Sequence, residues 1–233
     1  MRRVWLLATN VVREQRWFLL VMFAYITGIT GMMLFAGDGR EDDVLAVFKQ
    51  VAAYGTFFSV VIAASLIQTD RKSRQIIAVL SKAVTRREYI AGMIGGVNLS
   101  TASYQAAVFA SLFVLFRHAP IQTAVVMMLH LLVASLLVSV VTILFTTFLH
   151  PLLATGAAGM VLAAPIALEK MGWTWWARAM PAVALIKHAL SFTLEQPLAV
   201  ESGVLTLALA ECVALWLLAG WIFERRDVTL AVE

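Results

Sequence analysis

Six long apolar runs, separated by short charged or proline-containing stretches, constrain this chain more than any other feature. The hydrocarbon core of a bilayer takes about 20 helical residues, and each run reaches or nearly reaches that length. The composition agrees, because 14% of the residues are charged, whereas soluble domains carry about 25%. The sequence therefore predicts an all-α polytopic membrane protein with a single transmembrane domain over residues 1–233. The predicted spans are approximately 17–36, 46–69, 89–116, 121–149, 152–168 and 203–223.

The distribution of Lys and Arg predicts the orientation of the spans. Six spans place both termini on one side of the membrane, and twelve of the 18 Lys and Arg residues fall on that side. Basic residues concentrate in cytoplasmic loops, so we expect both termini in the cytoplasm of a multi-pass protein of the cell membrane, of the bacterial inner-membrane type. The net charge of +4 then reflects topology, and we expect a lipid membrane and no nucleic acid as a partner.

Residues 1–16 form a predicted amphipathic helix with a basic face. Val4, Leu7 and Val11 share one arc of this helix, while Arg3 and Arg13 lie on the other. Such a helix suits the membrane interface, with its arginines toward anionic lipid. The alternative is that these residues are the first turns of a longer spanning helix. Because the charges at 13–16 interrupt the apolar stretch, we expect no cleaved signal peptide.

Residues 169–202 form the irregular part of the predicted topology, on the external side before the last span. Trp173, Trp175 and Trp176 are typical of a membrane interface. Pro181 and Pro197 bracket an apolar piece that is too short to span a bilayer. We predict a pair of short re-entrant helices here, since irregular backbone is tolerated at membrane depth where other helices bury it. A plain external loop is the alternative.

Residues 70–88 form a basic segment between the second and third predicted spans. If this segment is helical, Ile76, Ile77 and Leu80 share one face, while Arg74 and Ser81 point away from it. An apolar ridge with charges at its rim fits the groove of a partner protein. A solvated cytoplasmic loop is the alternative that the pattern leaves open.

The stretch Arg74–Tyr89, RQIIAVLSKAVTRREY, resembles the segment that follows the second span in ATP-binding-cassette (ABC) permeases of the type-2 exporter class. The whole plan is similar: an amphipathic entry helix, six spans, an irregular external region before the last span, and a tail at Phe223–Asp227 (FERRD) like the basic ending of that family.

The resemblance implies a function for the basic segment. It would be a cytoplasmic coupling helix that docks into a separate nucleotide-binding subunit. Two copies of that ATPase subunit, carrying ATP and Mg²⁺, would serve a homodimer of this chain or a heterodimer with a related permease. The chain contains no G-x-x-x-x-G-K-[ST] loop, so we expect it to bind no cofactor of its own and to be no enzyme. The residues expected to contact the ATPase subunit are Arg71, Arg74, Ile76, Ile77, Leu80 and Arg86.

Glu211 is a second candidate functional residue, because it lies near the middle of the last predicted span. A carboxylate at that depth is costly unless it is paired, protonated or facing water. We predict that it lines a substrate path or a dimer seam, or accepts a hydrogen bond from Asn98 or Gln105. A protonated or hydrogen-bonded packing residue is the alternative.

Glycines and histidines complete the set of candidate residues. Gly92, Gly95 and Gly96 in the third span, with Gly156 and Gly159 in the fifth, predict close helix contacts. In so apolar a chain, histidines could also be haem ligands, so a haem-binding or other redox membrane anchor subunit is the alternative function. The histidines are His118, His130, His150 and His188.

Overall fold

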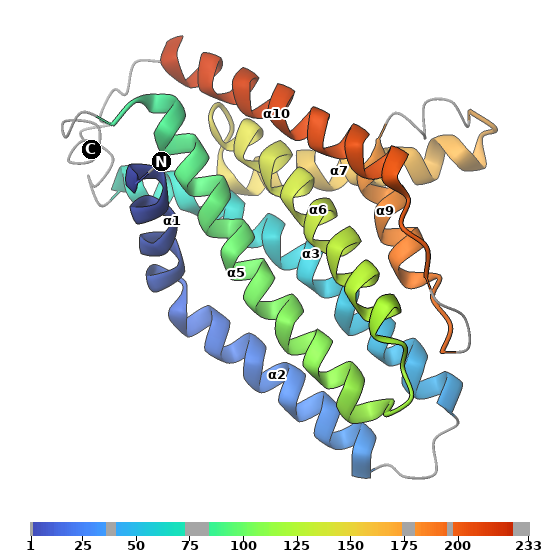
Figure 1. The fold of residues 1–233 in the computed structure, drawn as a ribbon. Coiled ribbons are helices and arrows are strands. Elements are labelled where there is room, and N and C mark those ends of the chain that lie inside the picture. Colours follow the sequence, from blue (N-terminus) through green and yellow to red (C-terminus); the bar gives the residue numbers. More distant parts are fainter. Residues whose placement is uncertain (1, 36–40, 73–83, 174–179, 195–197, 226–233) are drawn as a thin grey trace.

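A computed structural model describes residues 2–35, 41–72, 84–173, 180–194 and 198–225, except for the side chains of residues 71 and 72. Within these ranges the regular structure is entirely helical, without strands. Figure 1 shows the helices packed as one bundle. They are α1 (Arg2–Glu14), α2 (Arg16–Phe35), α3 (Glu41–Lys72), α5 (Arg86–Leu115), α6 (Ile121–Thr146), α7 (Pro151–Lys170), α9 (Pro181–Leu190) and α10 (Ser202–Arg225).

Six of the described helices, α2, α3, α5, α6, α7 and α10, are long and apolar enough to cross a membrane. They correspond to the six predicted spans and indicate a membrane-spanning protein. The main differences are at the helix starts. Glu41, Asp42 and Asp43, which precede the predicted span at 46, form the first turn of α3, where carboxylates interact favourably with the helix dipole. Helix α5 begins at Arg86, three residues before its predicted start at 89.

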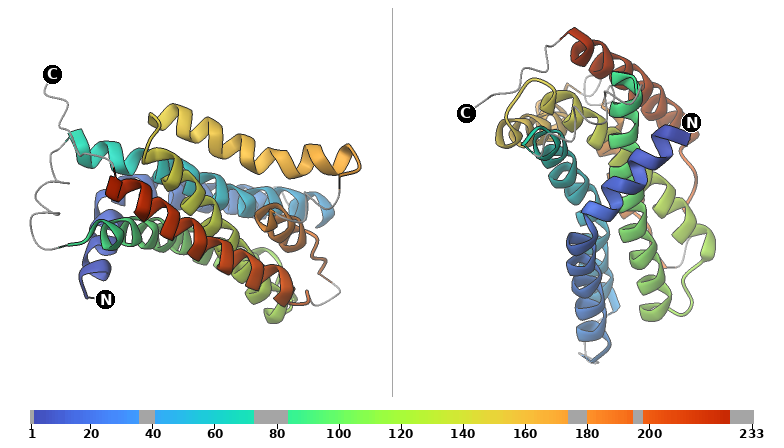
Figure 2. Two further views of the ribbon diagram at one scale, coloured as in Figure 1. Left: turned by 90° about the horizontal axis from the view of Figure 1, so that it is seen from above. Right: turned by 90° about the vertical axis from the view of Figure 1, so that its left-hand side faces the viewer.

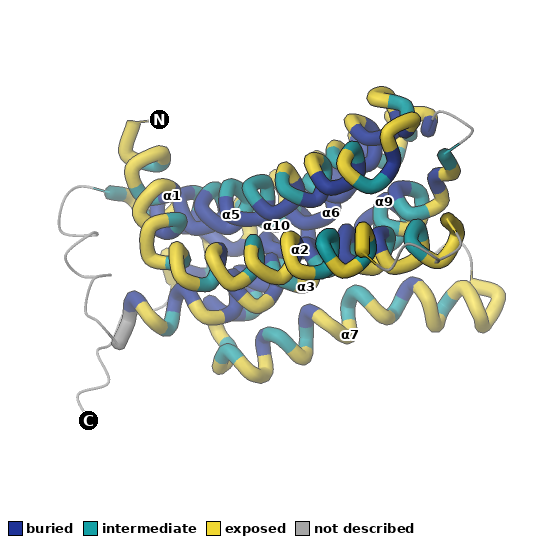
Figure 3. The backbone as a smooth tube through the Cα atoms, turned by 90° about the horizontal axis from the view of Figure 1, so that it is seen from below, coloured by how far each residue is buried: buried dark blue, intermediate teal, exposed yellow. Residues whose placement is uncertain are grey.

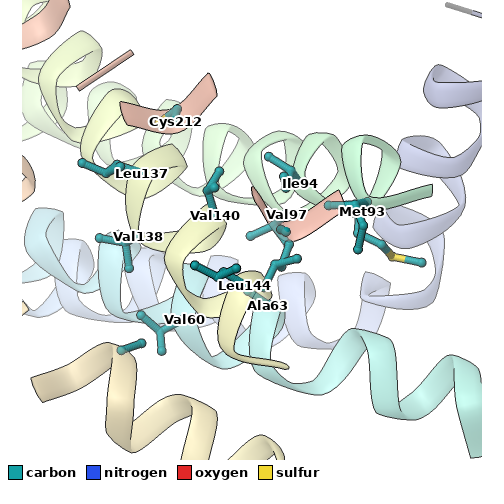
Figure 4. Close-up of a cluster of buried hydrophobic side chains, with 14 of the residues drawn as sticks. Val60, Ala63, Met93, Ile94, Val97, Leu137, Val138, Val140, Leu144 and Cys212 are labelled. Atoms are coloured by element: carbon teal, nitrogen blue, oxygen red, sulfur yellow. The ribbon is translucent and has the colours of Figure 1, made fainter. Parts of the chain in front are cut away.

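Helix α6 lies at the centre of the bundle, where it packs against α3, α5, α7, α9 and α10. The residues of α6 are apolar or small all round, as expected for a buried helix, except for Gln122 and His130. Figure 4 shows part of the core, in which Val140 and Leu144 of α6 approach Val97 of α5 and Ala63 of α3. A second buried cluster continues the core toward the opposite end of the bundle, around Phe48 and Phe192.

Helices α2 and α7 are peripheral. Figure 3 shows mostly exposed residues along α7, in which Ala154, Ala158 and Pro165 are the buried residues. Helix α2 buries Leu19 and Ile26. Their exposed apolar residues fit contact with lipid tails or with a second chain, where an apolar surface carries no penalty. Gly156 and Gly159 of α7, predicted to make close contacts, have no atom within 4 Å of the position of an added Cβ.

Helix α1 is separate from α2, as predicted, and diverges from it at Gln15 (Figure 2). Its apolar arc does not lie wholly in the membrane interface, however. Ala8 and Val11 are buried against glycines of α5, while Trp5 and Leu6 remain exposed. The expected interfacial helix is therefore partly a packing element of the bundle.

The irregular region before α10 contains the short apolar helix α9, which lies in the piece between Pro181 and Pro197 where a short re-entrant helix is predicted. Among the described residues between α7 and α10, α9 is the only helix, and residues 174–179 and 195–197 lie outside the described residues. Beyond α9 the chain contacts the start of α6, where the Leu198 amide donates a hydrogen bond of 3.1 Å to Thr123 Oγ1.

Candidate functional site

The starts of α1 and α5 and the ends of α3 and α10 lie together at one end of the bundle (Figure 1), which we call the basic end. The start of α5 is fixed by a reciprocal capping box. Thr85 Oγ1 accepts a bond of 3.2 Å from the Glu88 amide, and the Glu88 carboxylate accepts one of 2.9 Å from the Thr85 amide. This pairing satisfies two amides that have no partner within the helix. The basic segment 70–88 therefore ends in a well-defined helix start.

Two arginines at this start hold the end of α10. Arg86 Nη1 donates bonds of 2.8 Å to the carbonyl oxygens of Phe223 and Glu224. Arg87 Nε lies 2.9 Å from Glu224 Oε1 in an ion pair. The last carbonyls of a helix have no partner within it and carry partial negative charge, so cations bind there favourably. Arg86, predicted to contact an ATPase subunit, is thus placed in α5 with its guanidinium on α10.

A buried carboxylate ties α3 to the same point. Asp70, near the end of α3, is 5% exposed and accepts a hydrogen bond of 2.7 Å from Tyr89 Oη. The Tyr89 ring in turn stacks on Phe223, with ring centroids 5.9 Å apart. The start of α5, which follows residues 73–83, is therefore in direct contact with the end of α3, which precedes them. It is also in direct contact with the end of α10.

Helix α1 rests on α5 just beyond this junction. A Cβ added at Gly92 would lie 2.6 Å from Leu7 Cβ, and one added at Gly96 would lie 2.4 Å from Val11 Cβ. Glycine at both positions lets the two helices approach more closely than any larger residue would. The close contact predicted for these α5 glycines is confirmed, with α1 as the partner.

Most of the predicted coupling residues lie outside the described residues. Arg74, Ile76, Ile77 and Leu80 fall within 73–83, and Arg71 is in the last turn of α3 with its side chain undescribed. The docking face of the basic segment therefore stays a prediction, while the helix ends that flank it are defined by the contacts above.

Glu211, the other candidate, lies in α10 at the wall of a cavity of about 380 Å³. In the described part of the chain it has no hydrogen-bond or ion-pair partner. The predicted partners lie elsewhere: Gln105 Nε2 donates to the Ala52 carbonyl at 3.2 Å, and Asn98 Oδ1 is buried without a described partner. The predicted hydrogen bond from Asn98 or Gln105 is wrong, because Gln105 bonds to α3 and no described bond joins either residue to Glu211. The cavity is lined by Leu137, Val138, Val141, Leu144, Phe145, Val161, Leu162, Pro165, Met180, Ala182, Val183, Glu211, Ala214 and Leu215.

A polar cluster toward the other end of the bundle was not predicted. The rings of His130 in α6 and His188 in α9 are 4.9 Å apart. His188 Nδ1 lies 3.1 Å from Glu201 Oε1, and His188 Nε2 lies 2.8 Å from the Ala199 carbonyl oxygen. Both nitrogens of His188 therefore face oxygen acceptors. These residues are far apart in the sequence, so no local pattern signals that they meet.

The haem alternative gains no specific support from these histidines. His130 Nδ1 lies 2.7 Å from the Val126 carbonyl oxygen, and His130 Nε2 lies 3.4 Å from the Glu201 amide nitrogen. Both ring nitrogens are already engaged by backbone groups, which disfavours His130 as an axial ligand. Within the described ranges, no group of three or more His, Cys, Asp or Glu residues is arranged to hold a metal ion.

Comparison with known proteins adds no family assignment. No protein-family model matches the chain, and no curated protein matches it. The family resemblance therefore rests on the residues at 74–89 and 223–227 and on the order of the predicted elements.

Proposed function

We propose that this chain is the membrane-spanning permease subunit of an ABC exporter, which converts ATP hydrolysis by a separate subunit into movement of a substrate across the membrane. The supporting observations are the six apolar helices, the resemblance of residues 74–89 to a coupling segment, and the lack of a phosphate-binding loop in the chain. The observation that carries the proposal is the junction of three helix ends beside residues 73–83.

The junction supplies a mechanical route for such coupling. Asp70 and Tyr89 connect α3 to α5, and Arg86 and Arg87 connect α5 to α10. A push on the segment between α3 and α5 therefore acts on three helices that run the length of the bundle. Two ATPase subunits, closing on ATP and Mg²⁺, would push this segment in each of two permease copies, with both termini in the cytoplasm.

A pair of double variants tests the docking face. Ile76→Asp with Leu80→Asp places two carboxylates on the predicted apolar ridge. Gln75→Asp with Ser81→Asp adds the same charge to the same predicted helix, outside the arc of Ile76, Ile77 and Leu80. The tagged chain is purified from the cells that make it, and Mg-ATP hydrolysis in the eluate is measured.

We expect ATPase activity to co-purify with the wild type and with the Gln75/Ser81 variant, and to be lost with the Ile76/Leu80 variant. Desolvation of a carboxylate in an apolar groove opposes docking. Equal ATPase activity in both double variants would contradict the predicted docking face. A wild-type chain that co-purifies with no ATPase activity would contradict the proposed function.

The redox alternative is distinguished by an absorbance spectrum of the purified protein. The exporter proposal predicts no Soret band. A Soret band that survives purification would favour the haem-binding anchor and contradict the exporter.

A further inference from the structure

The cavity beside Glu211 lies between the long helices α6, α7 and α10. Helices α7 and α10 both pack on α6, and the cavity is lined by α6, by these two helices and by the start of α9. Its volume of about 380 Å³ falls in the range of roughly 300 to 1,000 Å³ that holds small organic ligands. The space is therefore large enough for a ligand with several rings or a branched alkyl body.

The chemistry of the walls is apolar with one exception. Leu, Val, Ala, Phe, Met and Pro side chains line the cavity together with Glu211. Phe145 adds an aromatic ring, a group whose face attracts cations. A ligand that fits must bring an apolar body.

Glu211 lacks a counter-charge in the part of the chain that the structure describes. It lies along α10 about 14 Å from Ser202 and about 21 Å from Arg225. Helix α6 contains no Lys or Arg. Lys187 of α9 pairs with Glu169, and the Arg225 guanidinium stacks on Trp221 at 4.0 Å from the ring centroid. The nearby basic side chains of α9 and α10 are thus engaged away from the cavity.

A carboxylate in an apolar wall that has no partner among the described residues is costly, and a cation placed against it recovers part of that cost. We propose that this cavity binds an apolar organic cation, with the apolar body against α6 and α7 and the positive charge at the Glu211 carboxylate. The identification of such a cation as the transported substrate rests on the proposed function, whereas its binding does not.

Two ions of matched shape and opposite charge test the proposal. Tetraphenylphosphonium is an apolar cation, and tetraphenylborate is an anion of nearly the same size and shape. Saturable binding of each ion to the purified full-length protein in detergent is measured by equilibrium dialysis, with protein-free micelles subtracted. No ATPase subunit is needed, so failure of this test is distinguishable from failure of the proposed function.

Three variants separate charge from space. Glu211→Gln keeps the shape and removes the charge. Ala214→Phe fills the cavity from an exposed position on α10 and keeps Glu211. Glu41→Gln removes one charge from an exposed position at the start of α3 and serves as the net-charge control.

We expect saturable tetraphenylphosphonium binding by the wild type and by Glu41→Gln. Binding should be at least about tenfold weaker in Glu211→Gln, which loses a partly desolvated charge pair, and in Ala214→Phe, which loses the space for the ligand. Tetraphenylborate should show no saturable binding. Equal affinity for both ions would mean an apolar groove of the kind that takes a lipid chain, and would overturn the proposal. Undiminished cation binding by Glu211→Gln, or no saturable binding by a folded wild type, would also overturn it.

Discussion

Two carboxylates in apolar helices, Asp70 and Glu211, have opposite surroundings. Asp70 lies near the end of α3, is almost fully buried and accepts a short hydrogen bond from Tyr89. Glu211 lies within α10, is half-buried at a cavity wall and has no partner among the described residues. A buried charge persists only when something satisfies it. At the basic end the chain itself supplies a donor to Asp70, whereas at Glu211 the proposed cation would supply the partner that the described residues do not.

The packing around the two regions differs in the same way. The basic end has α1 pressed on the glycines of α5 and aromatic rings stacked between α5 and α10. Around Glu211, α7 is largely exposed and its glycines face open space. The first region is tightly packed, and the second leaves a cavity beside Glu211.

The largest expected effect comes from breaking the close packing at the basic end. Gly96→Ala places a Cβ 2.4 Å from Val11 Cβ, so α1 must shift, and we expect a loss of about 1–3 kcal/mol typical of overpacking. Gly95→Ala, whose Cβ would meet Ala8 at an ordinary 3.4 Å, is the matched control and should gain up to about 1 kcal/mol from helix propensity. Thermal unfolding in detergent measures both. Equal stability of the two variants would show that α1 is not held by this contact.

A smaller effect is expected from removing the hydroxyl that satisfies Asp70. Tyr89→Phe keeps the ring stacked on Phe223 and removes the 2.7 Å hydrogen bond. The loss should be about 0.5–1.5 kcal/mol, the net contribution of a typical intramolecular hydrogen bond. Tyr25→Phe, at a partly exposed position, should change stability far less. If the two variants unfold at the same temperature, Asp70 is no better satisfied than Glu211 and the contrast between them disappears.

The smallest effect concerns Glu14, an exposed residue of α1 that lies near enough to Asp70 to interact with its charge. Burial, and secondarily the nearby Asp70 charge, raise the pKa of Glu14 above its ordinary value, while the bond from Asn10 acts in the opposite direction. A carboxyl with a raised folded-state pKa favours the folded protein in its protonated form, so its contribution to stability is lost as pH rises through that pKa.

Glu14→Gln keeps an acceptor for Asn10 Nδ2 and removes the charge. This variant should be slightly more stable than the wild type at neutral pH, and the difference should vanish at low pH, where Glu14 is protonated. Unfolding midpoints compared across pH give the measurement. A pH-independent difference would mean that the effect is not electrostatic.

Element boundaries were more predictable than side-chain partners. The six spans were found to within a few residues at most ends, because long apolar runs are a local signal. The early start of α5 also had a local signal, the Thr85-x-x-Glu88 pattern of a capping box. By contrast, Gln105 bonds to α3 and not to Glu211, because the orientation of each helix about its axis depends on its neighbours.

The sequence by itself determined that this chain is a set of apolar helices with a basic segment between the second and third, since bilayer-length apolar runs leave the backbone no other way to satisfy its hydrogen bonds. Only the tertiary structure decided which polar groups meet. It joined Asp70 to Tyr89 and Arg86 to the end of α10, brought His130 beside His188 and Glu201, and left Glu211 at a cavity. The physical reason is that these outcomes depend on helix rotation and crossing, which are properties of packed pairs of helices and not of any one segment.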